Sequence, residues 1–271
     1  MRDTILFGDC RETLKEFDEK ARMSVTAPPY YGLRDYGGED SQIGQEQSPE
    51  EFIDELVKVF REVRNVLTDD GTCWVNLGDS YYNYRKDGCI PKQTFSQNRQ
   101  DLPKTTPRRS NKLVGYKDKD LIGIPWMFAF AMRADGWYLR QDIIWHKPNP
   151  MPEAVNNRCV KSHEYIFLFT KKKQYYFNAD AIKVKDVRRG SVWSLNTASL
   201  KEAHFAVFPE DIPALCIKAG SKEGDVVLDP FMGSGTTALI AQRLAREWVG
   251  IELNPKYIEI IKRRTAQSEL F

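Results

Sequence analysis

The chain has 271 residues, of which 41% are hydrophobic and 29% charged, and its formal net charge is +2. This length allows a buried core that needs no disulfide or metal to be stable. The five cysteines are odd in number and none form a Cys-x-x-Cys pair, which argues against a disulfide framework or a zinc finger and predicts a cytoplasmic protein. No apolar run approaches the ~20 residues of a membrane span, and the charged start MRDTILFGDC is unlike a signal peptide.

The positive charge is concentrated in two segments. Residues 84–120 carry ten Lys or Arg against four Asp or Glu, and residues 147–190 again carry ten against four. A near-neutral protein with two basic segments is typical of a nucleic-acid binder that keeps its positive charge on one face. Two solvated loops would give the same counts, so charge alone does not decide between these interpretations.

The first half of the chain reads as strands at 4–7 and 22–27 with a helix at 11–17 between them. The clearest helix covers 48–67, because Ser48 is a good N-cap, Pro49 suits the first helical position and Glu51 completes a capping box. TDDG ends this helix, and TCWVNLG follows as a buried strand.

Residues 83–119 have no apolar periodicity, which predicts a long functional or disordered loop. Beyond them we expect a helix over 121–136, two adjacent strands over 137–147 and 163–171, and a helix over 208–220.

Strand and helix patterns alternate most regularly in the last sixty residues. Strands are expected at 225–230 and 248–253, and helices at 236–247 and 254–264. Alternating strands and helices predict an α/β fold whose mostly parallel sheet carries helices on both faces.

The turn FMGSG, between a strand and a helix, has the form of a cofactor loop. The helix N-terminus offers unpaired N–H groups, and Gly233 and Gly235 let a ligand approach the backbone. Glu252, at the end of the next strand, suits a pair of ribose hydroxyls. Thr236 stands where a phosphate-binding loop needs Lys, and a third glycine is missing, so a nucleotide phosphate is disfavoured. S-adenosylmethionine carries a ribose, an amino group and a sulfonium but no phosphate.

The stretch VTAPPYYG places two prolines directly after a strand, where neither can donate a ladder hydrogen bond. TAPPY resembles the catalytic motif of the amino-methylating DNA methyltransferases, in which Asp, Asn or Ser precedes Pro-Pro-Tyr/Phe. LDPFMGSGTT resembles their S-adenosylmethionine loop, GIELN their ribose-binding strand end and FGDC their adenine-contacting motif. Segments such as NLGDSY, DGWYLRQDIIWHKPNPMPE and HEYIFLF extend the resemblance along nearly the whole chain.

The catalytic motif precedes the cofactor loop, which is the order of the β class of these enzymes. The resemblance therefore implies a Rossmann-like methyltransferase fold with a circularly permuted motif order, in a single catalytic domain over residues 1–271. Within it, 84–119 is expected to be a loop that clamps DNA and 171–203 an insertion that recognises the target sequence.

The chemistry explains the prolines. An exocyclic amine is a poor nucleophile because its lone pair is delocalised into the ring. The rigid carbonyl of Pro28 can accept a hydrogen bond from that amine, and Tyr30 can stack on a base flipped out of the duplex. Ala27 departs from the family, since it cannot accept the second amine proton. Thr26, a neighbouring backbone group and Asp79 are the candidates for that role, and the motif resembles the Ser form associated with cytosine N4.

The residues expected to act follow from these motifs. The catalytic set is Thr26, Ala27, Pro28, Pro29 and Tyr30. The cofactor-binding set is Asp9, Asp229, Phe231, Gly233, Ser234, Gly235, Thr236, Glu252, Asn254 and His204. The DNA-binding set is Arg34, Arg85, Lys86, Arg108, Arg109, Lys112, Lys147, Arg188 and Arg189.

The sequence thus predicts a DNA methyltransferase that transfers a methyl group from S-adenosylmethionine to cytosine N4 in double-stranded DNA, without a metal or a membrane. Adenine N6 is the alternative target, and a degenerate DNA-binding homologue is the alternative class. The resemblance leaves room for a homodimer and for a cognate restriction endonuclease. Cytosine C5 chemistry is disfavoured, because no cysteine follows a proline as that family's nucleophile does.

Overall fold

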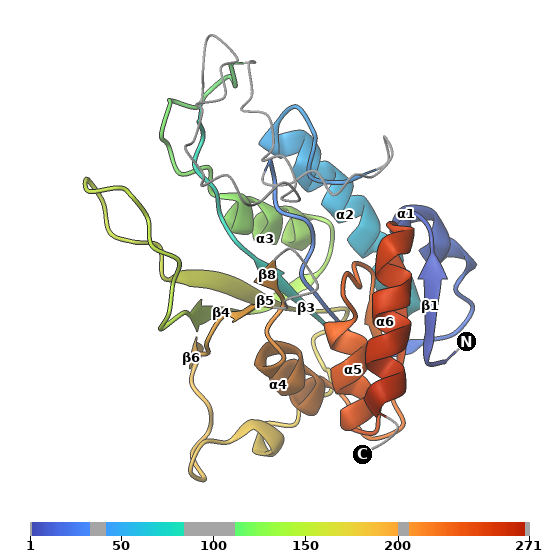
Figure 1. Ribbon diagram of the computed structural model, residues 1–271. Coiled ribbons are helices and arrows are strands. Elements are labelled where there is room, and N and C mark those ends of the chain that lie inside the picture. The colour runs from blue at the N-terminus through green and yellow to red at the C-terminus, as the bar shows by residue number, and fades with distance from the viewer. Residues whose placement is uncertain (1, 33–41, 84–111, 200–205, 269–271) are drawn as a thin grey trace.

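The computed structural model describes residues 2–32, 42–83, 112–199 and 206–268. Its main feature is an eight-stranded sheet in the order β1-β10-β9-β2-β3-β5-β4-β6, beside a small sheet of β7 and β8 (Figure 1). The strands are β1 (Thr4–Phe7), β2 (Ala21–Thr26), β3 (Leu67–Leu77), β4 (Tyr138–His146), β5 (His163–Thr170), β6 (Val192–Ser194), β7 (Ala198–Ser199), β8 (Ala206–Val207), β9 (Val226–Asp229) and β10 (Glu247–Glu252).

The sheet is mostly parallel, as expected. Only the pairs β3–β5 and β5–β4 are antiparallel, so β5 runs against both of its neighbours. The predicted pairing of the two strands near residues 140 and 166 is confirmed, while the insertion of β5 between β3 and β4 was not foreseen. β9 lies beside β2, with Met23 opposite Val227 and Ser24 opposite Leu228.

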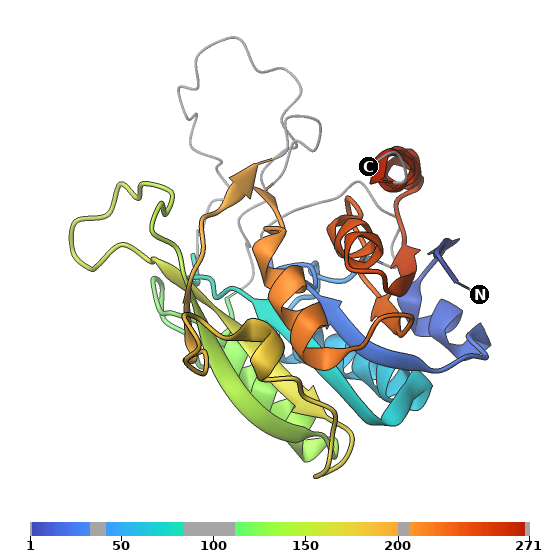
Figure 2. The same ribbon diagram turned by 90° about the horizontal axis from the view of Figure 1, so that it is seen from below.

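Helices cover both faces of the sheet (Figure 2). The helices are α1 (Cys10–Thr13), α2 (Pro49–Val66), α3 (Ile124–Ala134), α4 (Asp211–Gly220), α5 (Thr236–Arg243) and α6 (Pro255–Ser268), with short 3-10 turns at Leu14–Glu16 and Asp180–Ile182. One core packs α1, α2 and α3 against the sheet, and a second core packs α4, α5 and α6 against the opposite face. No helix in the described ranges is long and apolar enough to cross a membrane.

Strand alternation explains the two cores. Along β3, Cys73 and Val75 face the first core, whereas Trp74 between them faces the second. Along β9, Leu228 faces the first core and Val227 faces the second. Because both faces are buried, these strands read as continuous apolar runs.

The turn expected at TDDG is instead part of β3, which begins at Leu67 directly after α2. Ala21 pairs with Leu67 and Met23 with Thr72, so residues 68–71 bulge out of the ladder. An isolated sequence cannot reveal this, because the bulge follows from how β2 pairs with both ends of the longer strand.

The capping box of α2 is present. The backbone N–H of Glu51 donates to Ser48 Oγ at 3.1 Å, and Ser48 N–H donates to the Glu51 carboxylate at 3.3 Å. We expect Ser48→Ala to lower the free energy of unfolding by about 1 kcal/mol, because an N-terminal N–H loses its acceptor. Urea denaturation measures this, and Ser48→Asp, which keeps an acceptor, is the control. Equal losses in both variants would contradict the capping role.

Candidate active site

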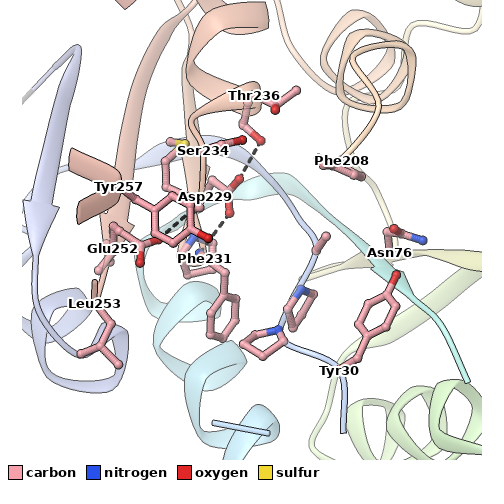
Figure 3. Close-up of a pocket in the computed structure, with 18 of the residues that line it drawn as sticks. Tyr30, Asn76, Phe208, Asp229, Phe231, Ser234, Thr236, Glu252, Leu253 and Tyr257 are labelled. Carbon is pink, nitrogen blue, oxygen red and sulfur yellow. Dashed lines mark hydrogen bonds between the residues drawn. The ribbon is translucent and has the colours of Figure 1, made fainter. Parts of the chain in front are cut away.

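A cavity of about 400 Å³ opens where the parallel strands end (Figure 3). Its walls come from segments that follow four of those strands: Gly8 and Asp9 after β1, Ala27 to Tyr30 after β2, Asp229 to Ser234 at β9, and Glu252 to Asn254 at β10. The proline turn and the glycine loop, about 200 residues apart in sequence, therefore meet in one site. This edge is where open α/β sheets bind their ligands.

A buried carboxylate joins the two turns. Thr26 Oγ1, at the end of β2, donates to Asp229 Oδ1 at 2.5 Å, and Thr237 Oγ1 of α5 donates to Asp229 Oδ2 at 2.6 Å. The Phe231 N–H also donates to Asp229 Oδ1, at 3.0 Å. Burial raises the pKa of Asp229 to about 6, although these hydrogen bonds act in the opposite direction. These bonds hold the end of β2 against the glycine loop, and Asp229 also lines the cavity, so its cofactor-binding role stays a prediction.

The glycine loop and the strand beside it are tied together through Glu252. One carboxylate oxygen accepts from Gly233 N–H at 2.8 Å and the other from Asn254 N–H at 2.8 Å. Each oxygen keeps a second lone pair, so the carboxylate can still accept two hydroxyl groups. Burial raises the pKa of Glu252 to about 7. The carboxylate is thus fixed between the glycine loop and the end of β10, and its ribose-binding role stays a prediction.

Gly235 occupies the left-handed region at φ +81°, where it begins α5. A Cβ there would come within 3.0 Å of Ile261 Cγ1 on α6, so glycine is required both for the backbone and for the packing. Arg264, also on α6, donates to the carbonyl oxygen of Ser234 at 2.7 Å and to its Oγ at 3.0 Å. The same guanidinium reaches Thr236 Oγ1 at 3.3 Å. No local sequence pattern indicates these contacts of Arg264, because they depend on where α6 packs against the glycine loop.

Asp9 lines the cavity but its carboxylate is already bound. It accepts from the Arg11 backbone N–H at 2.9 Å and from the Arg11 guanidinium, which also contacts Glu55. Burial opposes ionisation of Asp9, but the bonds from Arg11 outweigh it and lower the pKa. An adenine amine at this point would meet a carboxylate shared with Arg11, and the adenine-contacting role of Asp9 stays a prediction.

The far side of the cavity is a polar cluster that the motifs did not predict. Tyr30 Oη donates to Glu164 Oε2 at 2.5 Å, Lys147 Nζ donates to Glu164 Oε1, and Asn76 Nδ2 donates to Glu164 Oε2 at 3.2 Å. Tyr30 and Asn76 face the cavity opposite Glu252 and Tyr257 (Figure 3). A Cβ on Gly78 would stand 2.7 Å from the Tyr30 ring, so the ring is wedged as well as hydrogen-bonded.

Thr26 and Asp79, the two side chains expected to act in place of a polar residue at position 27, make hydrogen bonds elsewhere. Thr26 is fully buried against Asp229. Asp79 caps α3 by accepting from Gly123 N–H at 3.0 Å and from Ile124 N–H at 3.1 Å. Neither side chain lines the cavity. The two interpretations are therefore set aside, because both side chains already hold the fold together.

The predicted DNA-binding residues are spread widely. Lys147 lies inside the cavity beside Glu164 rather than on an outer surface. Lys112 and Arg188 are exposed, and Arg189 Nε donates to the Ile182 carbonyl at 2.9 Å. The segment 171–203 contributes β6 to the sheet edge beside β4. Six residues with predicted roles lie outside the described part of the chain: Arg34, Arg85, Lys86, Arg108, Arg109 and His204. Phe208, a few residues after His204, lines the cavity.

The described residues of this site form neither a reactive thiol nor a metal centre. Cys10 lines the cavity, but burial raises the pKa of its thiol far above the usual range. It would therefore be a poor nucleophile at neutral pH. Among the described residues, no group of three or more His, Cys, Asp or Glu is arranged to hold a metal ion.

A family model and the most similar sequences identify the same protein family. Residues 21–263 match the model of a DNA methylase family of N6 and N4 methyltransferases. The chain is 46% identical to the Type II methyltransferase M.Cfr9I of Citrobacter freundii over 96% of its own length and 87% of the relative's. It is also 46% identical to M.SmaI of Serratia marcescens, over 96% and 89% of the two chains.

Solved structures share the fold. A PvuII DNA methyltransferase described as cytosine-N4-specific superposes with a TM-score of 0.72 at 20% identity, covering 96% of this chain and 85% of that one. TTHA0409 of Thermus thermophilus, a putative DNA modification methylase solved with S-adenosyl-L-methionine, gives a TM-score of 0.68 at 26% identity, covering 97% and 93%. The Rossmann-like methyltransferase fold expected from the motif order is confirmed.

Proposed function

The chain belongs to this DNA methylase family and is a DNA amino-methyltransferase, and from that premise we propose that it methylates the exocyclic N4 of cytosine in duplex DNA. The observation that carries the proposal is the meeting of the proline turn and the glycine loop in one cavity. The choice of cytosine rests on the motif TAPPY, which lacks the Asp of the adenine-type form and is closest to the Ser form.

S-adenosylmethionine is the methyl donor, and the residues present suit it. When bound, it supplies an electrophilic methyl group on its sulfonium sulfur. Glu252 accepts the two ribose hydroxyls, and the glycine loop lets the ligand approach the backbone beside Ser234. Phe231 and Tyr257 supply apolar lining on the same side of the cavity. The roles of Asp9 and Asn254 in this half of the cavity are part of the same proposal.

The target base enters the other half of the cavity. Its exocyclic amine cannot be reached inside the duplex, so the nucleotide is flipped out and stacks on Tyr30. The carbonyl of Pro28 accepts a hydrogen bond from the amine, and the prolines hold that carbonyl still. Held in this way, the amine nitrogen would be presented to the electrophilic methyl group, and its surplus proton would leave for water after the transfer. No residue of the chain becomes covalently attached.

Double-stranded DNA is the substrate, and the basic side chains of the two positive segments are proposed to contact its backbone. The relatives are named Type II methyltransferases, which supports a cognate restriction endonuclease as a functional partner. A DNA substrate supports the proposal that the protein acts in the cytoplasm of a bacterial or archaeal cell, whether it is encoded there or by a phage. A homodimer stays a prediction.

The product identifies the target base. Purified protein is incubated with S-adenosylmethionine and unmethylated DNA, which is then digested to nucleosides for mass spectrometry. We expect N4-methylcytosine, because the turn at Ala27 resembles the cytosine form. N6-methyladenine would contradict the choice of base, and no methylated nucleoside on DNA of varied sequence would favour a degenerate homologue.

Cofactor affinity should depend on pH through Glu252. Its pKa is about 7 in the free protein, and only the carboxylate accepts both ribose hydroxyls well. Affinity is therefore complete above that pKa and is lost as the pH falls through it. By linkage, the Kd for S-adenosylmethionine measured by calorimetry should be about tenfold weaker at pH 6 than at pH 8. The control, Glu252→Gln, should bind weakly with little pH dependence; parallel profiles for the two proteins would refute this assignment.

A further inference from the structure

Ala27 has no polar side chain, but the residue beside it on the neighbouring strand has one. β2 and β3 are adjacent and parallel, with Thr26 opposite Val75. The next residues along, Ala27 and Asn76, therefore stand side by side at the carboxyl edge of the sheet. Both line the cavity. Asn76 is only 2% exposed, so its side chain has few other directions to take.

The amide of Asn76 is oriented by its partners. Its Nδ2 donates to Glu164 Oε2 at 3.2 Å and to the Tyr165 carbonyl at 3.1 Å. Both partners are acceptors, so the nitrogen must face them and the amide cannot be flipped without two repulsive contacts. Oδ1 is left as an acceptor, and within the described residues no group donates to it. Asn76 lines the cavity, where water or the amine of a bound base can donate to this oxygen.

We propose that Asn76 is the hydrogen-bond acceptor that Ala27 lacks: its Oδ1 accepts the second proton of the target amine while the Pro28 carbonyl accepts the first. This inference rests on the proposed amino-methyltransferase function and adds a substrate-binding residue to it. With two acceptors on its two hydrogens, the amine is held in the orientation that presents its lone pair to the methyl group. Neither acceptor takes the proton itself, which still leaves for water after transfer.

Glu164 is then a positioning residue. Its Oε2 receives both Tyr30 Oη and Asn76 Nδ2, so one carboxylate sets the ring on which the base stacks and the amide that meets its amine. Lys147 pairs with the other oxygen and lies 4.4 Å from the centre of the Trp145 ring. The ion pair holds this carboxylate, which is 11% exposed, in place as the acceptor for Tyr30 and Asn76.

The test is a rescue experiment on single-turnover methylation of DNA. Asn76→Ala should slow methyl transfer by about 100-fold, the size typical for removing one preorganised partner of a reacting group. The Kd for S-adenosylmethionine should stay unchanged, because Asn76 lies in the other half of the cavity. Adding Ala27→Ser, which restores the polar residue of the family, should recover much of the lost rate. Asn65→Ala on the exposed face of α2 is the matched control and should leave the rate unchanged.

A purely structural Asn76 would not respond to a hydroxyl at position 27, so an Asn76→Ala protein that binds cofactor but is not rescued overturns the proposal. An unchanged rate in Asn76→Ala overturns it too. If that variant does not fold, Glu164→Gln, of nearly the same shape, is used instead; it should slow transfer, keep cofactor affinity and be rescued in the same way, and an unchanged or unrescued rate counts against the proposal. Failure of the wild-type protein to methylate DNA would instead refute the proposed function.

Discussion

The site depends on one buried hydrogen bond, from Thr26 Oγ1 to Asp229. Strands β2 and β9 are neighbours, and both end at this point. A carboxylate buried here must be satisfied, because each unpaired buried polar group costs about 1–3 kcal/mol. Hydroxyls from Thr26 and Thr237 and the amide of Phe231 meet that demand together. The hydrogen bonds to this one carboxylate therefore hold the proline turn, the glycine loop and the start of α5 in a single arrangement.

That arrangement divides the cavity into two halves with different chemistry. The half lined from the ends of β1, β9 and β10 presents the carboxylate of Glu252, which Gly233 N–H and Asn254 N–H hold in place. The half beside β2, β3 and β5 presents the Pro28 turn, the Tyr30 ring and the cluster around Glu164. The order of these parts along the chain is permuted, but sheet adjacency, not chain order, decides which residues meet. The dividing line runs between β9 and β2, so the reacting atoms belong at that boundary.

Local patterns in the sequence were enough to predict α2 with its cap, the alternating strands and helices of the last sixty residues, the glycine loop and the place of Glu252 at the end of a strand. These features depend on residues close together in the chain. The cluster of Glu164, Asn76 and Lys147 was missed, because it forms only when β5 inserts between β3 and β4. The binding of Asp9 by Arg11 was missed for a related reason: Arg11 takes its orientation partly from Glu55 on α2. Long-range packing thus decides which polar side chains are free to act and which are already engaged.

The Thr26–Asp229 bond holds the proline turn against the glycine loop. The most direct test is Thr26→Val, which keeps the shape of the side chain but removes the hydroxyl, measured at a temperature where the variant remains folded. We expect the single-turnover methylation rate to fall by about tenfold or more, with the affinity for S-adenosylmethionine much less affected and with Thr26→Ser restoring the rate. A Thr26→Val protein that transfers the methyl group at the wild-type rate would contradict it.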